Sequence, residues 1–269
     1  LRCIALVLVI LVLARPQTTN KWQNSEIEGI DIMLAIDVST SMLAEDLKPN
    51  RLEAAKDVAA EFINGRPNDN IGITLFAGET FTQCPLTVDH AVLLDMIHNI
   101  KCGLITDGTA VGMGIANAVT RLKDSKAKSK VIILLTDGTN NKGDISPMTA
   151  AEIAKSFGIR VYTIGVGTNG MAPYPYPVGN TVQYVSMPVE IDEKTLTEIA
   201  GTTDGNYFRA TSNSKLKEVY EEIDKLEKTK LNVKEYSKRD EEYHWFALAA
   251  FLCVLLEVLL RNSVLKKIP

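Results

Sequence analysis

Histidine, cysteine, aromatic residues and basic charge are all scarce in this chain. Its 269 residues include three His and four Cys, aromatic residues make up 6%, and the net charge is −4. Recognition of nucleic acid needs a basic surface and aromatic stacking partners, so this composition excludes nucleic acid as the main partner. The sequence also has no Gly-x-Ser-x-Gly segment, so it lacks a common signature of serine hydrolases.

The first residues are strongly apolar. Residues 3–14 form an unbroken apolar run, and the chain begins with Leu1 rather than Met. A helix that spans a bilayer needs about 20 apolar residues, so residues 1–14 are predicted to be a truncated transmembrane helix. A secretory signal peptide is the alternative, because residues 12–14, Val-Leu-Ala, resemble a small-residue cleavage site.

The other end of the chain carries a longer apolar run. Residues 245–260 are interrupted only by Glu257, with aromatic residues before them and basic residues after them. This pattern predicts a transmembrane helix over residues 244–261 and a basic tail over residues 262–269. Basic flanks stay in the cytoplasm, so the large middle domain is predicted to lie on the periplasmic side of a bacterial inner membrane.

Strand-like and helix-like segments alternate between these runs. The predicted strands cover residues 32–36, 71–76, 81–86, 131–135, 161–166 and 207–208, and the predicted helices cover 51–64, 91–100, 110–122, 147–157, 193–200 and 216–226. This order predicts an α/β fold with a doubly wound, mostly parallel central sheet and helices on both faces. The domain is assigned to residues 30–227, with a polar linker at 15–29 and a juxtamembrane linker at 228–243. Residues 171–179 contain three Pro and are predicted to be a stiff, exposed loop.

A short polar motif directly follows the first predicted strand. It reads Asp37-Val-Ser39-Thr-Ser41, with one carboxylate and two hydroxyls at alternate positions. These are hard oxygen ligands of the kind that Mg²⁺, Mn²⁺ and Ca²⁺ prefer, and no His or Cys lies nearby to favour zinc. One carboxylate and two hydroxyls cannot complete an octahedral shell, so a metal site here requires further ligands.

Candidates for those ligands come from a tetrapeptide that occurs twice. Thr-Asp-Gly-Thr is found at residues 106–109 and 136–139. Thr109 directly precedes a predicted helix, whereas Asp137 follows a buried strand. Because ligands of such sheets bind at the carboxyl ends of the strands, we select Thr109 from the first copy and Asp137 from the second.

These five residues resemble the metal-ion-dependent adhesion site (MIDAS) of von Willebrand factor A domains. The resemblance covers roughly residues 29–226. It implies a divalent cation, with Mg²⁺ expected first, held by Asp37, Ser39, Ser41, Thr109 and Asp137. It further implies that an acidic side chain of a protein partner completes the metal shell. The loops expected to set specificity include Thr40, Met42 and residues 78–80, 103–108 and 139–144.

A narrower resemblance rests on the arrangement of the whole chain. Two apolar segments bracket the domain, Arg15-Pro-Gln follows the first, and the segments 81–87 and 161–168 lie inside. Together these features resemble the Bat (aerotolerance) membrane proteins of bacteria. The resemblance implies a non-enzymatic, membrane-anchored interaction domain that assembles with other Bat proteins and, indirectly, with a MoxR-type AAA+ ATPase.

Two other interpretations compete with the adhesion site. The alternative function is a Mg²⁺-dependent phosphoryl-transfer or hydrolase enzyme that uses Asp37, but Ser39 stands where such chemistry usually has a second acidic residue. The run Gly165-Val-Gly-Thr-Asn-Gly170 fits a dinucleotide fingerprint, but prolines follow where a helix should begin. Two cysteines of the domain, Cys84 and Cys102, fit either a disulfide or two unpaired core residues.

Overall fold

The computed structural model describes residues 7, 13, 17–18, 29–168, 170–178, 181–189, 191–232, 240–241 and 243–263. The chain divides into two compact units. The larger unit spans Ile27–Val233, and the smaller one combines Leu1–Glu26 with Lys234–Pro269.

A six-stranded sheet forms the centre of the larger unit. Its strand order is β4-β3-β2-β5-β6-β9, and every neighbouring pair is parallel except β3 and β4. The strands are β2 (Asp31–Asp37), β3 (Asn70–Phe76), β4 (Thr80–Thr87), β5 (Lys130–Thr136), β6 (Ile159–Val166) and β9 (Tyr207–Ala210). The predicted α/β fold with a mostly parallel sheet is therefore confirmed, and β3 and β4 form its one antiparallel pair.

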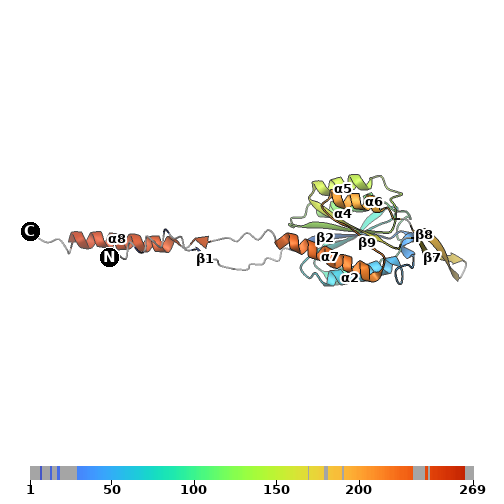
Figure 1. Cartoon of the computed structure of the whole chain (residues 1–269), viewed down its shortest axis with the longest axis horizontal. Helices are drawn as coiled ribbons and strands as arrows, with labels where there is room; N and C mark the ends of the chain where they lie inside the picture. The colour runs from blue at the N-terminus through green and yellow to red at the C-terminus, as the bar shows by residue number, and fades with distance from the viewer. Residues whose placement is uncertain are drawn as a thin grey trace, which may run out of the picture. The chain divides into compact units, whose positions relative to one another are not determined.

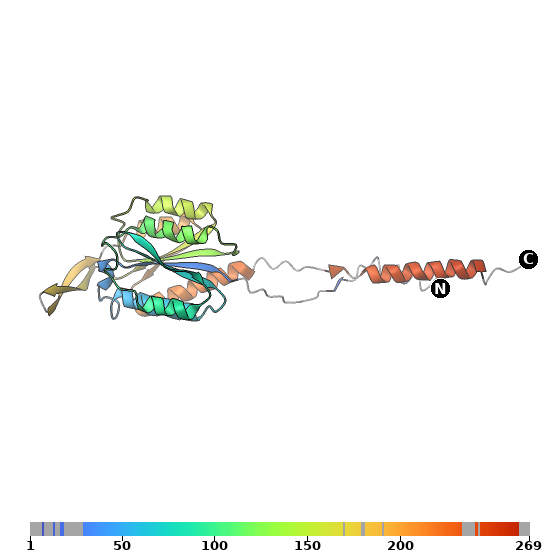
Figure 2. The ribbon, with the colours of Figure 1, turned by 180° about the vertical axis from the view of Figure 1, so that it is seen from behind.

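Helices cover both faces of this sheet (Figures 1 and 2). One face carries α4, α5 and α6, and the other carries α2, α3 and α7. The helices are α2 (Arg51–Asn64), α3 (His90–His98), α4 (Val111–Leu122), α5 (Pro147–Ser156), α6 (Glu193–Thr202) and α7 (Asn213–Asn232). The last helix is longer than the predicted 216–226, because the residues on either side of that range contain no glycine or proline to end it.

The central strands are buried on both faces, and this burial fixes where their ends lie. All seven residues of β2 are buried, as are the last six of β5. Alternate side chains of β2 enter two separate apolar cores, one under each helical layer. The backbone of the strand then has to leave the core at its carboxyl end, where Asp37 is the last strand residue. A short 3₁₀-helix, η1 (Thr40–Leu43), follows directly.

A second, two-stranded sheet corrects one prediction. Residues 171–179 were expected to form a loop, but β7 (Gly170–Val178) and β8 (Thr181–Val189) form an antiparallel hairpin. Figure 1 shows this hairpin projecting from the domain. The three prolines of β7 alternate with other residues, which places them all at the same edge of the strand. Edge positions tolerate proline because no ladder hydrogen bond is lost there.

The smaller unit contains a short strand pair and one long helix. Strand β1 (Gln17–Thr18) pairs with β10 (Asp240–Glu241), and α8 covers Tyr243–Ser263. None of the helices in the described residues combines the length and the apolar character that a membrane crossing requires. The spanning role predicted for residues 244–261 is therefore not supported by this part of the chain. Most of the predicted helix at 1–14 and of the tail at 262–269 lies outside the described residues.

Candidate functional site

The motif after β2 folds into a compact turn held by its own side chains. The backbone N–H of Ser39 donates to Asp37 Oδ1 at 2.9 Å. Ser39 lies at the N-cap of η1, and its Oγ is 3.0 Å from Ser41 Oγ. The two hydroxyls predicted as ligands are thus adjacent, above a carboxylate that is fully buried.

The end of β5 brings the second carboxylate to the same place. Ser41 Oγ donates to Asp137 Oδ1 at 2.7 Å, across 96 residues of sequence. Thr136 Oγ1 donates to Asp37 Oδ2 at 2.6 Å. Because β2 and β5 are parallel neighbours, their carboxyl ends meet at one edge of the sheet, as the sequence analysis expected.

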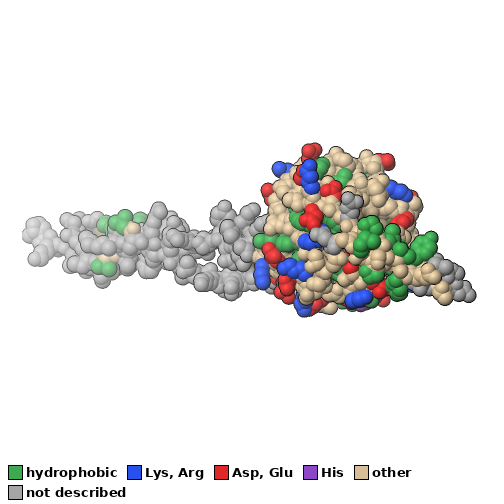
Figure 3. All heavy atoms as spheres, turned by 45° about the vertical axis from the view of Figure 1, so that its right-hand side comes forward, with side chains coloured by type: hydrophobic (Ala, Val, Ile, Leu, Met, Phe, Trp, Pro, Cys, Tyr) green, Lys and Arg blue, Asp and Glu red, His purple; other side chains and the backbone are tan. Residues whose placement is uncertain are grey.

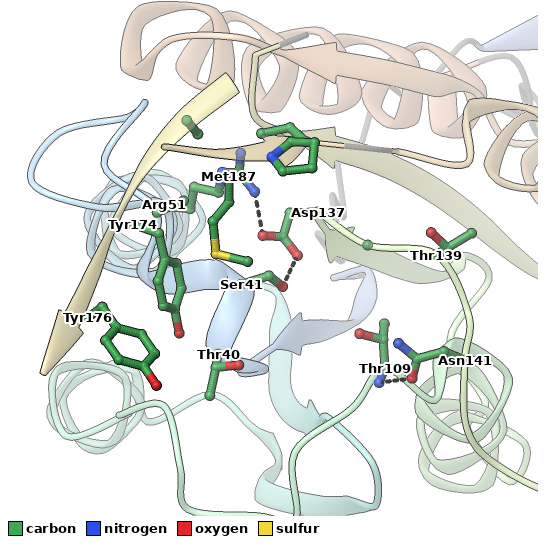
Figure 4. Close-up of a pocket in the computed structure, with 15 residues that line it drawn as sticks. Thr40, Ser41, Arg51, Thr109, Asp137, Thr139, Asn141, Tyr174, Tyr176 and Met187 are labelled. Carbon is green, nitrogen blue, oxygen red and sulfur yellow. Dashed lines mark hydrogen bonds and ion pairs between the residues drawn. The ribbon is translucent and has the colours of Figure 1, made fainter. Parts of the chain in front are cut away.

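Thr109 approaches this cluster from the start of α4. The position that a Cβ atom would take at Gly138 lies 3.3 Å from Thr109 Oγ1, so the threonine is packed on the turn that follows Asp137. The Oδ1 of Asn141 accepts a hydrogen bond from the Thr109 backbone N–H at 2.9 Å. Thr109, Ser41 and Asp137 line one cavity of about 400 Å³ (Figure 4).

The two carboxylates lie in an environment that disfavours their charge. The pKa of Asp37 is raised to about 7, first by burial and then by the nearby Asp137 carboxylate, against the opposing effect of hydrogen bonds from Ser39 and Thr136. Burial also raises the pKa of Asp137, against the opposing effect of Arg51. Two buried carboxylates therefore face each other with incomplete charge compensation, which is the electrostatic situation that a bound cation relieves.

Arg51 is a member of the site that the sequence analysis missed. Its Nη1 donates to Asp137 Oδ2 at 2.6 Å, and its Nε and Nη2 each donate to Asp46 at 2.7 Å. The Arg51 side chain is only 2% exposed. Asp46 also accepts from the backbone N–H and hydroxyl of Thr168, just after β6. An arginine at the first position of a helix gives no local signal that it turns inward.

A sequence profile of the von Willebrand factor type A domain matches residues 31–222. The chain belongs to the von Willebrand factor A family. The match contains all five predicted metal ligands and the whole six-stranded sheet, so the family recognised from the polar motif is confirmed.

Solved structures of two bacterial proteins resemble this von Willebrand factor A domain. An aerotolerance-related membrane protein from Bacteroides fragilis is 34% identical, with a TM-score of 0.64, and the match covers 73% of this chain and 100% of that one. The protein BatB from Bacteroides thetaiotaomicron is also 34% identical, with a TM-score of 0.66, and the match covers 74% of this chain and 100% of that one. The predicted resemblance to Bat proteins is thereby confirmed.

A more distant solved structure contains a metal. Proximal thread matrix protein 1 of the mussel byssus, with a zinc-occupied MIDAS motif, is 25% identical, with a TM-score of 0.58. The match covers 74% of this chain and 45% of that one. This likeness supports a divalent cation in the present domain without deciding which cation it is.

Relatives that are longer than this chain come from several bacteria. An uncharacterized protein of Borreliella burgdorferi is 27% identical over 98% of this chain and 78% of its own length. A UPF0353 protein of Mycolicibacterium paratuberculosis is 32% identical over 70% of this chain. The match spans 58% of that mycobacterial relative, so the relative extends well beyond the shared part.

The donor set of this von Willebrand factor A domain fits a hard divalent cation. Within the described residues, no group of three or more His, Cys, Asp or Glu is placed to hold a metal, so a cation at this edge has to use hydroxyl oxygens. Ser39 and Ser41 provide two adjacent ones, and Thr109 faces the same cavity. Both oxygens of Asp37 and both of Asp137 already accept hydrogen bonds, which suits carboxylates that act on a cation through water.

The loops around the site differ in part from those expected. Met42 is fully buried and takes no part in an outer surface. Asp107, which is not among the predicted ligands, accepts hydrogen bonds from the backbone N–H and hydroxyl of Thr40 at 3.0 and 2.8 Å. It therefore fixes the central residue of the motif. Cys84 and Cys102 are both free, so the open question of a disulfide between them is answered.

The hairpin β7–β8 is the largest feature of the site that the sequence analysis missed. Tyr174, Tyr176 and Met187 line the same cavity as the predicted ligands. Figure 4 shows Met187 directed toward Ser41 from the hairpin side, with Tyr174 beside it. The hairpin is bonded to the turn that follows η1, because the backbone N–H of Glu45 donates to the Pro173 carbonyl at 2.9 Å. One wall of the cavity is therefore polar and the opposite wall is aromatic and apolar.

Proposed function

We propose that this von Willebrand factor A domain captures a protein partner through a divalent cation bound at the carboxyl edge of its sheet. The contact between Ser41 and Asp137 carries the proposal, because it joins the motif of β2 to the end of β5 beside a second hydroxyl on Ser39. Asp37, Ser39, Ser41, Thr109 and Asp137 would hold the cation. When bound there, the cation supplies an open coordination position for a carboxylate oxygen of the partner.

Mg²⁺ is the cation that we propose, with Mn²⁺ or Ca²⁺ as alternatives. Hydroxyl and carboxylate oxygens suit all three cations, and the residues that line the cavity include no His or Cys. Cys102 Sγ lies nearby and donates to the Ser39 carbonyl at 3.4 Å, but burial and the nearby carboxylates raise the pKa of its thiol, which disfavours the thiolate that a metal would need. The domain's own residues orient the site. Asp107 holds Thr40, and Arg51 holds Asp137, so the hydroxyls are placed before any partner arrives.

A binding role agrees better with the site than catalysis by Asp37 does. The Asp37 side chain is fully buried, and hydrogen bonds from Ser39 and Thr136 occupy both of its oxygens. A phosphoryl group could not reach this carboxylate without opening the turn. The alternative enzyme function therefore has no observation in its favour.

We further propose that the protein acts at the bacterial inner membrane, with the domain on the periplasmic side, within an envelope assembly linked to oxygen tolerance. Support comes from the Bacteroides fragilis relative, which is described as an aerotolerance-related membrane protein. Other Bat-type proteins are the proposed partners, with a MoxR-type AAA+ ATPase as an indirect one. Crosslinking in cells, with identification of the products, tests this assignment.

Thermal unfolding with and without added metal tests the cation site. A ligand at about 100 times its Kd stabilises the folded state by about 2.7 kcal/mol, so millimolar Mg²⁺ should raise the Tm of the wild type clearly above its value in EDTA. Ser39→Ala should remove most of this rise because it deletes one hydroxyl donor.

Ser156→Ala, at the distant end of α5, is the matched control and should respond to Mg²⁺ like the wild type. Titrations with Mn²⁺, Ca²⁺ and Zn²⁺ then rank the cations. If none of these ions stabilises the wild type, the proposed function is wrong.

A further inference from the structure

The hairpin β7–β8 lacks charge entirely. Residues 170–189 contain no Asp, Glu, Lys, Arg or His, in a chain of which 23% is charged. Its large side chains are nevertheless exposed, with Met171 and Tyr184 each at 60% and Met187 at 47%. Figure 3 shows hydrophobic side chains gathered on the hairpin side of the domain. Exposed apolar surface without charged residues to protect it is characteristic of an interaction site.

One edge of the hairpin is closed to strand addition. Proline has no backbone N–H, and β7 carries proline at 173, 175 and 177. The Pro173 carbonyl accepts a hydrogen bond from Glu45, outside the hairpin, so the peptide groups at these alternate positions point away from β8. The outer edge of β7 therefore presents no donor at any of these three positions and cannot complete a ladder with another strand.

The other edge of the hairpin is open. β8 pairs only with β7 in its sheet. Tyr184 lies opposite Pro175, and Ser186 lies opposite Pro173. The peptide groups of these two residues therefore point away from β7, and both residues keep their N–H groups. The outer edge of β8 thus offers donors and acceptors to an extended chain at Tyr184 and Ser186, whereas Pro188, opposite Met171 on the same edge, offers only its carbonyl.

The open part of this edge, at Tyr184 and Ser186, leads toward the cation site. Met187, Pro188 and Val189 are the last residues of β8, and all three line the cavity that also contains Ser41 and Asp137. A strand added along β8 would have one end at this cavity. Its alternate side chains would extend the face that Tyr174 and Tyr176 already form, because side chains alternate between the two faces of a sheet.

We propose that the outer edge of β8 receives an extended segment of the protein partner as a third strand, in which one Asp or Glu reaches the cation site and apolar residues follow at alternate positions. This inference rests on the proposed function, since the cation supplies the position for the acidic side chain. The strand edge adds what the cation alone lacks: backbone hydrogen bonds for affinity, and an apolar face for selectivity.

A peptide selection provides the probe for this inference. Short random peptides displayed on phage are selected on the purified full chain in millimolar Mg²⁺, and the bound sequences are read. The proposal expects an acidic residue followed by apolar residues at alternate positions. In hydrogen exchange, synthetic versions of these peptides should protect the amides of Tyr184 and Ser186.

Ser186→Pro is the decisive variant. It removes an outward N–H while leaving the ladder to β7 intact, as Pro173 does on the opposite strand. We expect it to weaken peptide binding by about tenfold or more, since it removes one backbone hydrogen bond and places a ring at the contact. Ser186→Ala keeps the N–H and is the matched control, with binding close to that of the wild type.

The two proposals fail in different ways. Peptide affinity that Ser186→Pro leaves unchanged, with stabilisation by Mg²⁺ retained, overturns the strand-addition proposal alone. Selection that yields no acidic, alternating peptide overturns it as well. A wild-type dimer that Ser186→Pro dissolves would assign the edge to a second copy of this chain instead. If Mg²⁺ does not raise the Tm of the wild type, the proposed function itself is overturned.

Discussion

Arg51 connects the two anionic groups beside the cation site. Its guanidinium binds Asp46 through two nitrogens and Asp137 through the third, and all three side chains are at most 4% exposed. Burial lowers the pKa of Arg51, but its partners outweigh this effect, and its pKa is raised overall. A planar fork with several donors is required for this arrangement, and the single ammonium group of lysine does not supply it.

Replacing Arg51 should therefore destabilise the fold strongly. Arg51→Gln leaves the carboxylates of Asp46 and Asp137 buried without the positive charge of the guanidinium. This is expected to cost about 3–5 kcal/mol in the free energy of unfolding. Urea unfolding followed by circular dichroism measures this cost. Arg121→Gln, at an exposed position of α4, is the control and should unfold at nearly the wild-type urea concentration. A variant at Arg51 that is as stable as this control would contradict the assigned role.

At the residue scale, the sequence was sufficient to predict the polar groups that directly follow a predicted strand. Asp37, Ser39 and Ser41 directly follow an apolar strand, and the parallel order of the strands predicted that Asp137 would lie nearby. Arg51 and Asp107 gave no such signal. Their roles depend on partners distant in sequence, 86 residues away for Arg51 and Asp137 and 67 for Asp107 and Thr40.

Among the elements, α7 adds one buried carboxylate, Glu227, to the apolar residues that pack it on the sheet. Glu227 Oε1 accepts a hydrogen bond from the Tyr162 hydroxyl at 2.6 Å, and its Oε2 accepts one from Ser129 at 2.7 Å. Arg160 pairs with both oxygens. Burial raises the pKa of Glu227, but these bonds outweigh burial and hold the pKa below its ordinary value of 4.5.

This attachment makes stability depend on pH. The pKa of Glu227 is lower in the folded state than in the unfolded state. The contribution of Glu227 to the free energy of unfolding is therefore fully present above about pH 4.5, and it is lost as the pH falls through the lowered pKa. At neutral pH, Glu227→Gln should lower the free energy of unfolding by about 2 kcal/mol, because charged hydrogen bonds are lost. The difference from the wild type should shrink near pH 3.

Urea unfolding at both pH values checks this prediction. Glu218→Gln, exposed on the same helix, is the matched control and should follow the wild type at both. A difference for Glu227→Gln that stays constant with pH would refute the assignment.

The elements of the sheet were predictable because each has a strong local signal. β2 and β5 are continuous apolar runs, and α2 begins after Asn50, whose side chain accepts from the Glu53 N–H as an N-cap. The hairpin β7–β8 was not predictable in the same way. Alternating prolines are typical of a stiff loop, and only pairing with β8 shows that they occupy one edge of a strand.

For the whole molecule, the fold and the hairpin are separable. Ala172 is the only buried residue among the described side chains of β7 and β8. Replacing residues 171–188 by a short Gly-Ser linker should therefore change the free energy of unfolding by no more than about 1 kcal/mol. Stabilisation by Mg²⁺ should remain, while the affinity for the selected peptides should be lost.

Thermal unfolding and peptide titration of this deletion variant measure both effects. The matched control shortens the loop 123–128 instead, far from the cation site, and should keep peptide binding. A deletion variant that unfolds at a much lower temperature would show that the hairpin contributes to the core after all.

The bonds of Asp46 have a consequence for the order of binding events. Asp46 accepts from Arg51, which holds Asp137, and from Thr168, two residues before the hairpin begins. A cation bound beside Asp137 that changes these hydrogen bonds also changes the affinity of the hairpin for its partner. The coupling free energy between the two sites is the same in both directions. A partner bound to the hairpin would then raise the affinity for the cation by the same factor by which the cation raises the affinity for the partner.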